Sequence, residues 1–198
     1  MPYDVLPLGP LETNCWLCWD EATRGCAVID PGAEPEKLVR ALQEKDLHPK
    51  AILLTHAHFD HVGAAAPLAW ALNLPVYVHE ADTALPERLT GGPLCFTAEY
   101  AEGDTVTVDG LRFEVLETPG HTMGSVCLRC GALLFTGDTL FAGACGRTDL
   151  GGSAAAMRAS LCRLALLPGD YAVLPGHGPA STLDLERRTN PYLREALR

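Results

Sequence analysis

The chain has 198 residues, of which 47% are hydrophobic and 20% are charged. This length suits one globular domain with a sizeable core, and the composition is typical of a folded protein and not of a disordered or fibrous one. The 15 basic and 25 acidic side chains give a formal net charge of −10, which would repel the phosphate backbone of nucleic acids. We therefore expect residues 1–198 to form a single domain with no nucleic acid partner.

The sequence contains no segment suited to a membrane. No run of about 18 or more apolar residues occurs. The first residues, Met1 to Asp4, lack the basic start and the apolar stretch of a secretory signal. These features predict a cytoplasmic protein with no membrane partner.

Strands and helices alternate in the first half of the chain. Short apolar stretches separated by Gly and Pro predict a strand meander in the first 30 residues. The apolar residues between 34 and 44 share one side of a helix, and residues 51–54 are fully apolar, as in a buried strand. A helix over 64–72 and a strand over 76–78 follow. Residues 81–101 show few clear periodicities, and no element is assigned to them.

The second half repeats this order of strands and then helices. Apolar and alternating runs predict strands over residues 105–108, 112–116, 126–130, 133–136 and 171–174. Helical spacing predicts helices over residues 154–166 and 183–188. Two such halves predict two sheets packed face to face with helices outside, in a four-layer α/β arrangement. Loops at the strand ends would then carry the chemistry.

Two closely spaced cysteine pairs raise the possibility of a structural zinc site. Cys15 with Cys18, and Cys127 with Cys130, lie in runs that read as strands, where residues three apart point to opposite faces. Opposed thiols cannot share an ion without a bulge in the strand. We therefore interpret these cysteines as small apolar core residues that stay reduced in the cytosol.

The most informative segment, Thr55-His56-Ala57-His58-Phe59-Asp60-His61, directly follows the predicted buried strand 51–54. If extended geometry persists, His56 and His58 project the same way, because side chains repeat every two residues. A turn near Gly63, where glycine permits close backbone approach, would bring Asp60 and His61 to the same cavity. The spacing suits a metal cluster and differs from the i, i+4 histidine pair that other zinc hydrolases carry on a helix.

Three later polar residues complete the candidate metal-ligand set: His121, Asp138 and His177. Each one follows an apolar strand, and each one sits beside glycine. Glycine is expected where the backbone must turn sharply to direct a side chain back towards a shared site.

Together these motifs resemble the metallo-β-lactamase superfamily. The resemblance spans nearly the whole chain and implies the αββα sandwich. It also implies two divalent metal ions, with zinc preferred and iron or manganese as alternatives. By this resemblance the first ion is held by His56, His58 and His121. The second ion is held by Asp60, His61 and His177, and Asp138 bridges both.

Within the superfamily, residues 141–149 and the tail from Gly176 are most similar to glyoxalase II, the hydroxyacylglutathione hydrolase, and to its short bacterial relatives. Two departures bear on the substrate. Glyoxalase II carries an additional helical region that grips glutathione, and we do not expect one in the short segment after His177. Arg147 and Asp149 stand where that enzyme places a lysine and a tyrosine against glutathione. Arg147 is a candidate substrate-binding residue because it can pair bidentately with a carboxylate, and the alternative is a structural ion pair with Asp149.

The ligand set predicts a hydrolase. A zinc-like ion lowers the pKa of water from about 15.7 to about 7, which favours hydroxide by roughly 12 kcal/mol. We expect a metal-bridged hydroxide oriented by Asp60 and Asp138, the catalytic carboxylates, to attack a thioester. The expected substrate is a small 2-hydroxyacyl thioester such as lactoylglutathione, whose thiolate leaves readily.

Two other activities remain open on the same residues. A persulfide dioxygenase would use one iron held by His56, His121 and Asp138, whereas the retained His177 favours two metals. A lactonase or another ester hydrolase would use the same seven ligands. The sequence does not indicate the oligomeric state.

Overall fold

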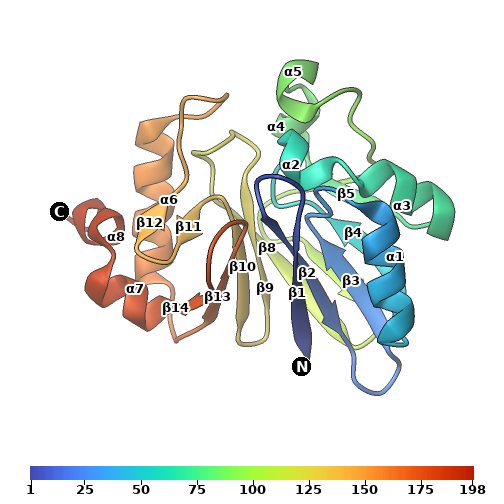
Figure 1. The fold of residues 1–198 in the computed structure, drawn as a ribbon. Helices are drawn as coiled ribbons and strands as arrows, with labels where there is room; N and C mark the ends of the chain where they lie inside the picture. The colour runs from blue at the N-terminus through green and yellow to red at the C-terminus, as the bar shows by residue number, and fades with distance from the viewer.

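Twelve of the strands form two six-stranded sheets, packed face to face with helices on the outside (Figure 1). This arrangement comes from a computed structural model that describes residues 1–198. The first 100 residues build one sheet and residues 105–182 build the other. The predicted four-layer αββα sandwich is therefore confirmed.

The first sheet has the order β1-β2-β3-β4-β5-β6. Its strands are β1 (Tyr3–Leu8), β2 (Thr13–Trp19), β3 (Gly25–Ile29), β4 (His48–Leu53), β5 (Val76–His79) and β6 (Ala98–Tyr100). The antiparallel hairpins β1–β2 and β2–β3 form the predicted meander, and β3, β4, β5 and β6 then run parallel. Parallel strands need crossover connections, which are supplied here largely by helices.

The second sheet has the order β14-β13-β10-β9-β8-β7. Its strands are β7 (Thr105–Val108), β8 (Leu111–Glu117), β9 (Val126–Cys130), β10 (Leu133–Gly137), β13 (Ala172–Pro175) and β14 (Ser181–Thr182). A two-stranded ribbon beside it consists of β11 (Leu140–Phe141) and β12 (Ala144–Cys145). The sequence patterns did not predict this ribbon, because strands of two residues are too short to show a period.

Five of the eight helices cover the outer faces of the two sheets. In chain order the helices are α1 (Pro35–Glu44), α2 (Phe59–Val62), α3 (Ala65–Leu72), α4 (Glu80–Thr83), α5 (Glu87–Thr90), α6 (Ala154–Leu166), α7 (Leu183–Thr189) and α8 (Pro191–Ala196). Figure 1 shows α1 and α3 on the side of the first sheet and α6, α7 and α8 on the side of the second. The predicted helices 34–44 and 154–166 correspond to α1 and α6.

Two segments differ from the sequence-based expectation. The sequence patterns predict no helix or strand in residues 81–101, but this segment contains most of α4 and all of α5 and β6. These elements have three or four residues each, fewer than a helical or strand pattern needs in order to be visible. A further helix, α8, follows α7 because the Asn190 side chain accepts hydrogen bonds from the backbone N–H groups of Tyr192 and Leu193 and so caps its start.

The core consists of three apolar layers. Eighteen buried residues, including Trp16, Ile29, Phe113 and Phe135, fill the space between the sheets. A cluster of 19 lies between the first sheet and its helices, and a cluster of 12 lies between the second sheet and α6 and α8. Each sheet therefore has both of its faces buried against apolar side chains.

The cysteine pairs lie as predicted, on opposite strand faces. Cys15 belongs to the outer layer of the first sheet and Cys18 to the layer between the sheets, while Cys127 and Cys130 divide in the same way. All eight cysteines are free thiols. None of the helices has the length and apolar character needed to cross a membrane.

Candidate metal centre

The candidate ligands lie together because the strands that carry them end at one edge of the sandwich. In the first sheet β3 and β4 run parallel. In the second sheet β10 runs parallel to β13, and both β8 and β10 run antiparallel to β9. The carboxyl ends of β4, β8, β10 and β13 are followed by the segments that contain His56, His121, Asp138 and His177, respectively.

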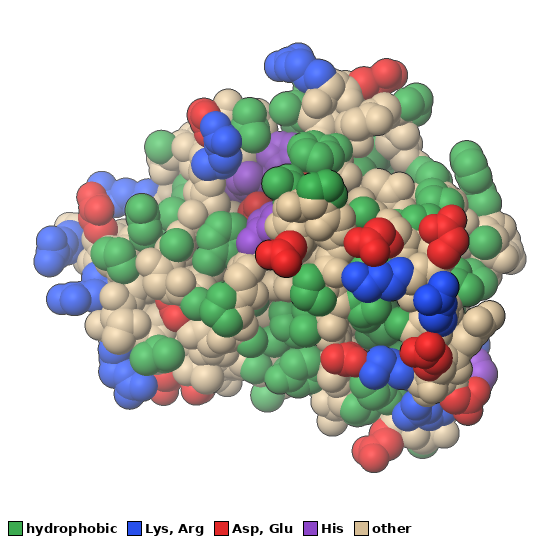
Figure 2. Space-filling view, in the orientation of Figure 1, with side chains coloured by type: hydrophobic (Ala, Val, Ile, Leu, Met, Phe, Trp, Pro, Cys, Tyr) green, Lys and Arg blue, Asp and Glu red, His purple; other side chains and the backbone are tan.

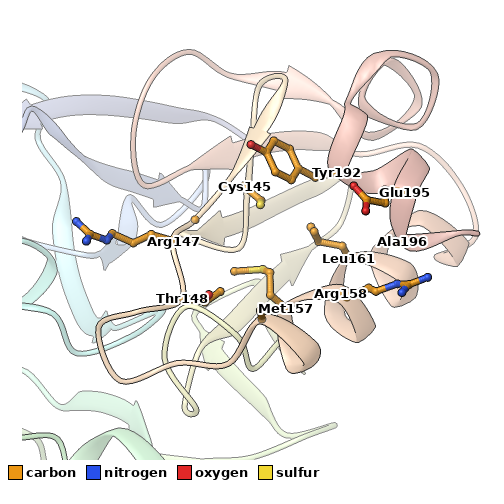
Figure 3. A pocket seen from close by; sticks show the side chains of 11 residues that line it. Cys145, Arg147, Thr148, Met157, Arg158, Leu161, Tyr192, Glu195 and Ala196 are labelled. Atoms are coloured by element: carbon orange, nitrogen blue, oxygen red, sulfur yellow. The ribbon is translucent and has the colours of Figure 1, made fainter.

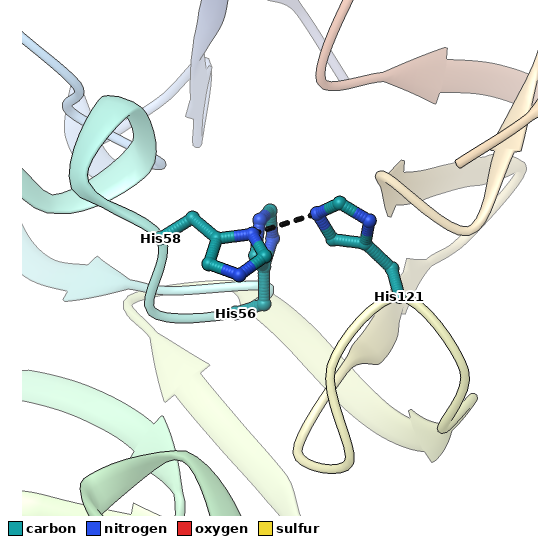
Figure 4. A group of neighbouring side chains, drawn as sticks. All are labelled: His56, His58 and His121. Atoms are coloured by element: carbon teal, nitrogen blue, oxygen red, sulfur yellow. Dashed lines mark hydrogen bonds between the residues drawn. The ribbon is translucent and has the colours of Figure 1, made fainter. Parts of the chain in front are cut away.

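The first group of ligands consists of His56, His58 and His121, whose ligating atoms lie within 4.8 Å of one another. Nδ1 of His58 is 2.8 Å from Nε2 of His121, and the ring of His56 stands nearly perpendicular to both (Figure 4). All three rings are buried. Beyond β4 the chain leaves the sheet, and His58 is the residue before α2, so the two histidines of the first motif converge from a loop.

The second group consists of Asp60, His61 and His177, again within 4.8 Å. Asp60 and His61 lie on the single turn of α2, and Nε2 of His177 is 3.2 Å from Oδ2 of Asp60. The close approach predicted for Gly63 is present: a Cβ atom there would lie 2.4 Å from the carbonyl oxygen of Gly32. The turn of α2 is therefore held tightly against the end of β3.

Asp138 lies between the two groups. Its Oδ2 is 3.5 Å from Nε2 of His121 and 3.6 Å from Nε2 of His177, and its Oδ1 is 3.4 Å from Nε2 of His61. One carboxylate thus reaches both groups. The structure brings together all seven residues that the sequence selected as metal ligands.

Main-chain carbonyl oxygens accept hydrogen bonds from three of the histidines, on the side of each ring that faces away from the centre. Nδ1 of His121 donates to the carbonyl of Arg147 at 2.7 Å, and Nδ1 of His177 donates to that of Leu11 at 3.2 Å. Nε2 of His58 donates to the carbonyl of Leu150 at 3.0 Å. A carbonyl can only accept, so each ring carries a proton on its outer nitrogen, and its inner nitrogen can bind a cation once it is unprotonated.

Asp30 orients the other two histidines, and the sequence reasoning missed it. Its Oδ2 is 2.9 Å from Nδ1 of His61 and accepts the hydroxyl proton of Thr55 at 2.6 Å. The Thr55 oxygen is therefore free to accept from Nδ1 of His56, 3.2 Å away. Asp30 stands directly after a strand and two residues before Gly32, a signal similar to the one that selected the other ligands, and could have been found by it.

The donor set fits divalent metal ions. Nε2 of His56, Nε2 of His61 and Oδ1 of Asp138 are buried and make no hydrogen bond of good geometry; each histidine belongs to one of the two groups, and Asp138 lies between them. Imidazole and carboxylate are the ligands that zinc, iron and manganese accept in proteins. A buried polar atom without a hydrogen bond is costly, so three such atoms among the candidate ligands indicate that cations would satisfy them.

The charge at the centre also favours a cation. Burial alone would lower the pKa of His61, but the carboxylates of Asp138 and Asp30 outweigh burial and hold that pKa well above its usual value. The pKa of Asp138 is lowered although burial opposes this, because His61 and His121 lie close to its carboxylate. The carboxylates thus stabilise positive charge in the second group.

The centre opens to solvent through a cavity of about 410 Å³, to which both ligand groups contribute. Figure 2 shows histidine side chains at the bottom of a hollow with basic side chains near its rim. Arg88 and Arg147 line this cavity together with the apolar Leu11 and Phe59. A small, partly apolar substrate with a negative group is the kind of molecule that such walls accommodate.

Arg147 also borders a second cavity, of about 330 Å³, between the segment Cys145–Thr148 and helices α6 and α8. Figure 3 shows its side chain directed away from the other side chains of that cavity. Its guanidinium forms two 2.6 Å hydrogen bonds to Asp149, and both side chains are exposed. The ion pair considered from the sequence is therefore present, and Arg147 also reaches the cavity above the metal ligands.

Comparisons with known proteins agree with this geometry. The metallo-beta-lactamase superfamily profile matches residues 8–177. The hydroxyacylglutathione hydrolase GloC of Haemophilus influenzae is 36% identical, with 98% of each chain covered. TTHA1623, solved in a di-iron-bound form, is 47% identical with a TM-score of 0.84 over 96% of this chain and 99% of the other. The BLEG-1 B3 metallo-beta-lactamase is 37% identical with a TM-score of 0.87 over 97% and 99%. On fold, ligand geometry and sequence alike, the chain belongs to the metallo-beta-lactamase superfamily.

Proposed function

We propose that this metallo-hydrolase cleaves small thioesters, in particular a 2-hydroxyacyl-glutathione of the lactoylglutathione type. The observation that carries the proposal is the convergence of two ligand groups on the shared carboxylate of Asp138 at the floor of an open cavity. The first ion would be held by His56, His58 and His121. The second ion would be held by Asp60, His61 and His177, and Asp138 would contact both.

The identity of the metal is proposed on the same donor set. Imidazole nitrogens and carboxylate oxygens suit zinc, iron and manganese alike. The 47% identical protein that was solved with two irons supports iron as strongly as the ligand types support zinc. A persulfide dioxygenase with a single iron at His56, His121 and Asp138 is less well supported, because Asp60, His61 and His177 form a second complete group.

When bound, the two ions supply a low pKa for water and polarise the carbonyl that is to be attacked. The protein's own residues would position the attacking water molecule. Asp60 and Asp138 face the cavity and can orient a water molecule by accepting its hydrogen bonds. Asp60 is itself held by a 3.0 Å hydrogen bond from the hydroxyl of Thr13. No serine or cysteine nucleophile is required.

The leaving group favours a thioester over an oxygen ester. A thiol ionises near pKa 8.5, so a thiolate departs at neutral pH without an acid, whereas an alkoxide would need one. Arg147 stands at the rim of the cavity, and its five N–H donors exceed those used by Asp149, so it can also bind a substrate carboxylate. The 36% identity to a protein named hydroxyacylglutathione hydrolase supports this choice of substrate.

The test is the decrease of lactoylglutathione absorbance with purified protein of known metal content. We expect turnover by protein with about two metals per chain and its loss in Asp138→Asn, while the exposed Asp104→Asn variant serves as a matched control that retains activity. A chromogenic β-lactam in a parallel assay tests the activity named for the 37% identical lactamase. No turnover of the thioester, combined with a single iron per chain, would contradict the proposal.

A further inference from the structure

Asp82 on α4 is a fully buried carboxylate, 0% exposed, that is not one of the seven ligands. It lies in the stretch 81–101 to which the sequence patterns assigned no element. Its partners are two backbone N–H groups and one hydroxyl, with no basic side chain among them. Burying a carboxylate without a cationic partner is costly, so its three hydrogen bonds require an explanation.

All three hydrogen bonds go to the two loops that carry the first ligand group. Oδ2 of Asp82 accepts from the N–H of Ala57, at 2.8 Å, and Ala57 is the residue between His56 and His58. The same oxygen accepts from the hydroxyl of Thr122 at 2.9 Å, next to His121. Oδ1 accepts from the N–H of Gly124 at 2.8 Å. One carboxylate therefore ties two loops that are more than 60 residues apart in the chain.

The Asp82 carboxylate is closely packed against the main chain of Gly124. A Cβ atom on Gly124 would lie 2.5 Å from Oδ1 and 2.7 Å from Cγ of Asp82. Ser125 completes the arrangement, because its Oγ accepts from the N–H of Thr122 at 3.0 Å and lies 2.8 Å from the Thr122 hydroxyl. Only a carboxylate can accept on both of its sides; an amide would present an N–H₂ group to one of the donors.

The second ligand group has different anchors. His61 is held by Asp30, Asp60 by Thr13, and His177 by the carbonyl of Leu11. None of these contacts involves Asp82. Asp82 thus contacts only the loops of the first group, whereas Asp30 reaches His61 directly and His56 through Thr55.

We propose that Asp82 is a positioning residue for the first metal site: it clamps the His56–His58 loop to the His121 loop and so sets the separation of His58 from His121. The inference rests on the proposed metal centre. Outer contacts that orient metal ligands commonly contribute about 10- to 100-fold to metal affinity. Loss of the Asp82 clamp is expected to weaken one of the two sites and leave the other intact.

The experiment measures the zinc affinity of chelator-treated protein by calorimetric titration in two backgrounds. His177→Ala protein keeps the first ligand group, and His121→Ala protein keeps the second. We expect Asp82→Asn to raise the Kd for zinc about 10- to 100-fold in the His177→Ala background. In the His121→Ala background the Kd should change by less than about twofold, which also shows that the variant folds.

A second variant and a matched control sharpen the result. Gly124→Ala displaces Asp82 without removing its charge, and it should weaken the same site as Asp82→Asn. Glu186 is likewise a buried carboxylate, 2% exposed, that accepts from the N–H of Gly143 and the side chains of Ser181 and Asn190, so Glu186→Gln should leave both affinities unchanged.

Equal weakening in both backgrounds, or no change in the His177→Ala background, would overturn the assignment of Asp82. Wild-type protein that binds no zinc, iron or manganese would overturn the proposed metal centre as well, and this outcome is distinct from the first two.

Discussion

Nδ1 of His121 donates a 2.7 Å hydrogen bond to the carbonyl oxygen of Arg147. The main chain of Arg147 therefore orients a ligand of the first group, while its side chain lines the cavity above the centre. The two roles belong to different parts of one residue and can be separated by mutation.

Truncation of the side chain in Arg147→Ala keeps the main-chain oxygen in place. We expect unchanged metal content, because the hydrogen bond from His121 remains, and a KM for lactoylglutathione raised about tenfold through loss of a charged hydrogen bond. The value of kcat should stay within about twofold, since the lost contact binds substrate and transition state alike. A large fall in kcat with unchanged KM would contradict this role. Steady-state kinetics and metal analysis make the comparison.

Gly146→Ala should change the metal content and kcat, which Arg147→Ala is expected to leave nearly unchanged. A Cβ atom at Gly146 would lie 1.9 Å from the carbonyl oxygen of Asp138 and 3.2 Å from Nδ1 of His121. The segment must move, and with it the acceptor that holds His121. We expect reduced metal content and a lower kcat. Gly143→Ala is the matched control for metal content, because nothing lies within 4 Å of a Cβ atom there, although its positive φ will lower stability.

Removal of metal should lower both activity and stability. Ions that bind only the folded state stabilise it by mass action, so treatment with a chelator is expected to lower the melting temperature and abolish turnover. Restoration with Zn²⁺, Fe²⁺ or Mn²⁺ in separate samples, followed by thermal melting and assay, identifies the ions that the site accepts. Because histidine must be neutral to bind, restoration should become weaker as the pH falls. Although burial opposes this, Asp138 and Asp30 hold the pKa of His61 well above its usual value, so the loss should begin above the usual histidine range. Full activity after exhaustive removal of metal would contradict the proposed chemistry.

The cysteines should fall into two classes of reactivity. Burial raises the pKa of Cys26 to about 12 and that of Cys127 to about 12, so both remain protonated thiols at pH 8. Alkylation requires the thiolate and access to it. We expect an alkylating reagent at pH 8 to modify the half-buried Cys95 and Cys162 first, as followed by peptide mass spectrometry. Early labelling of Cys127 in native protein would show that the layer beneath α6 opens readily.

The layer between the sheets should dominate stability. Phe135 is 0% exposed and contacts the rings of Trp16 and Phe113 edge-on or tilted. Phe135→Ala leaves a cavity and is expected to lower the free energy of unfolding by about 3–5 kcal/mol. Phe96, which is 39% exposed, provides the control: Phe96→Ala should lower the free energy of unfolding clearly less than Phe135→Ala does. Urea titrations followed by tryptophan fluorescence measure both values.

Much of the fold and the candidate ligand set could be predicted from sequence patterns. Long apolar periods identified α1 and α6, because a helix of ten or more residues repeats its buried face several times. His56, His58, Asp60 and His61 were visible because they crowd into one short segment after an apolar strand. His121, Asp138 and His177 were visible because each pairs a ligand type with a neighbouring glycine.

The hydrogen bonds that hold these residues in place could not be predicted in this way. Asp30 and Asp82 contact segments that are 25 or more residues away, and no local pattern encodes which loop a buried carboxylate will reach. Sequence alone also left open whether Arg147 faces Asp149 or the cavity, and it does both. The physical reason is that periodicity and turn chemistry act between near neighbours in the chain, whereas hydrogen bonds between loops depend on how two complete sheets pack.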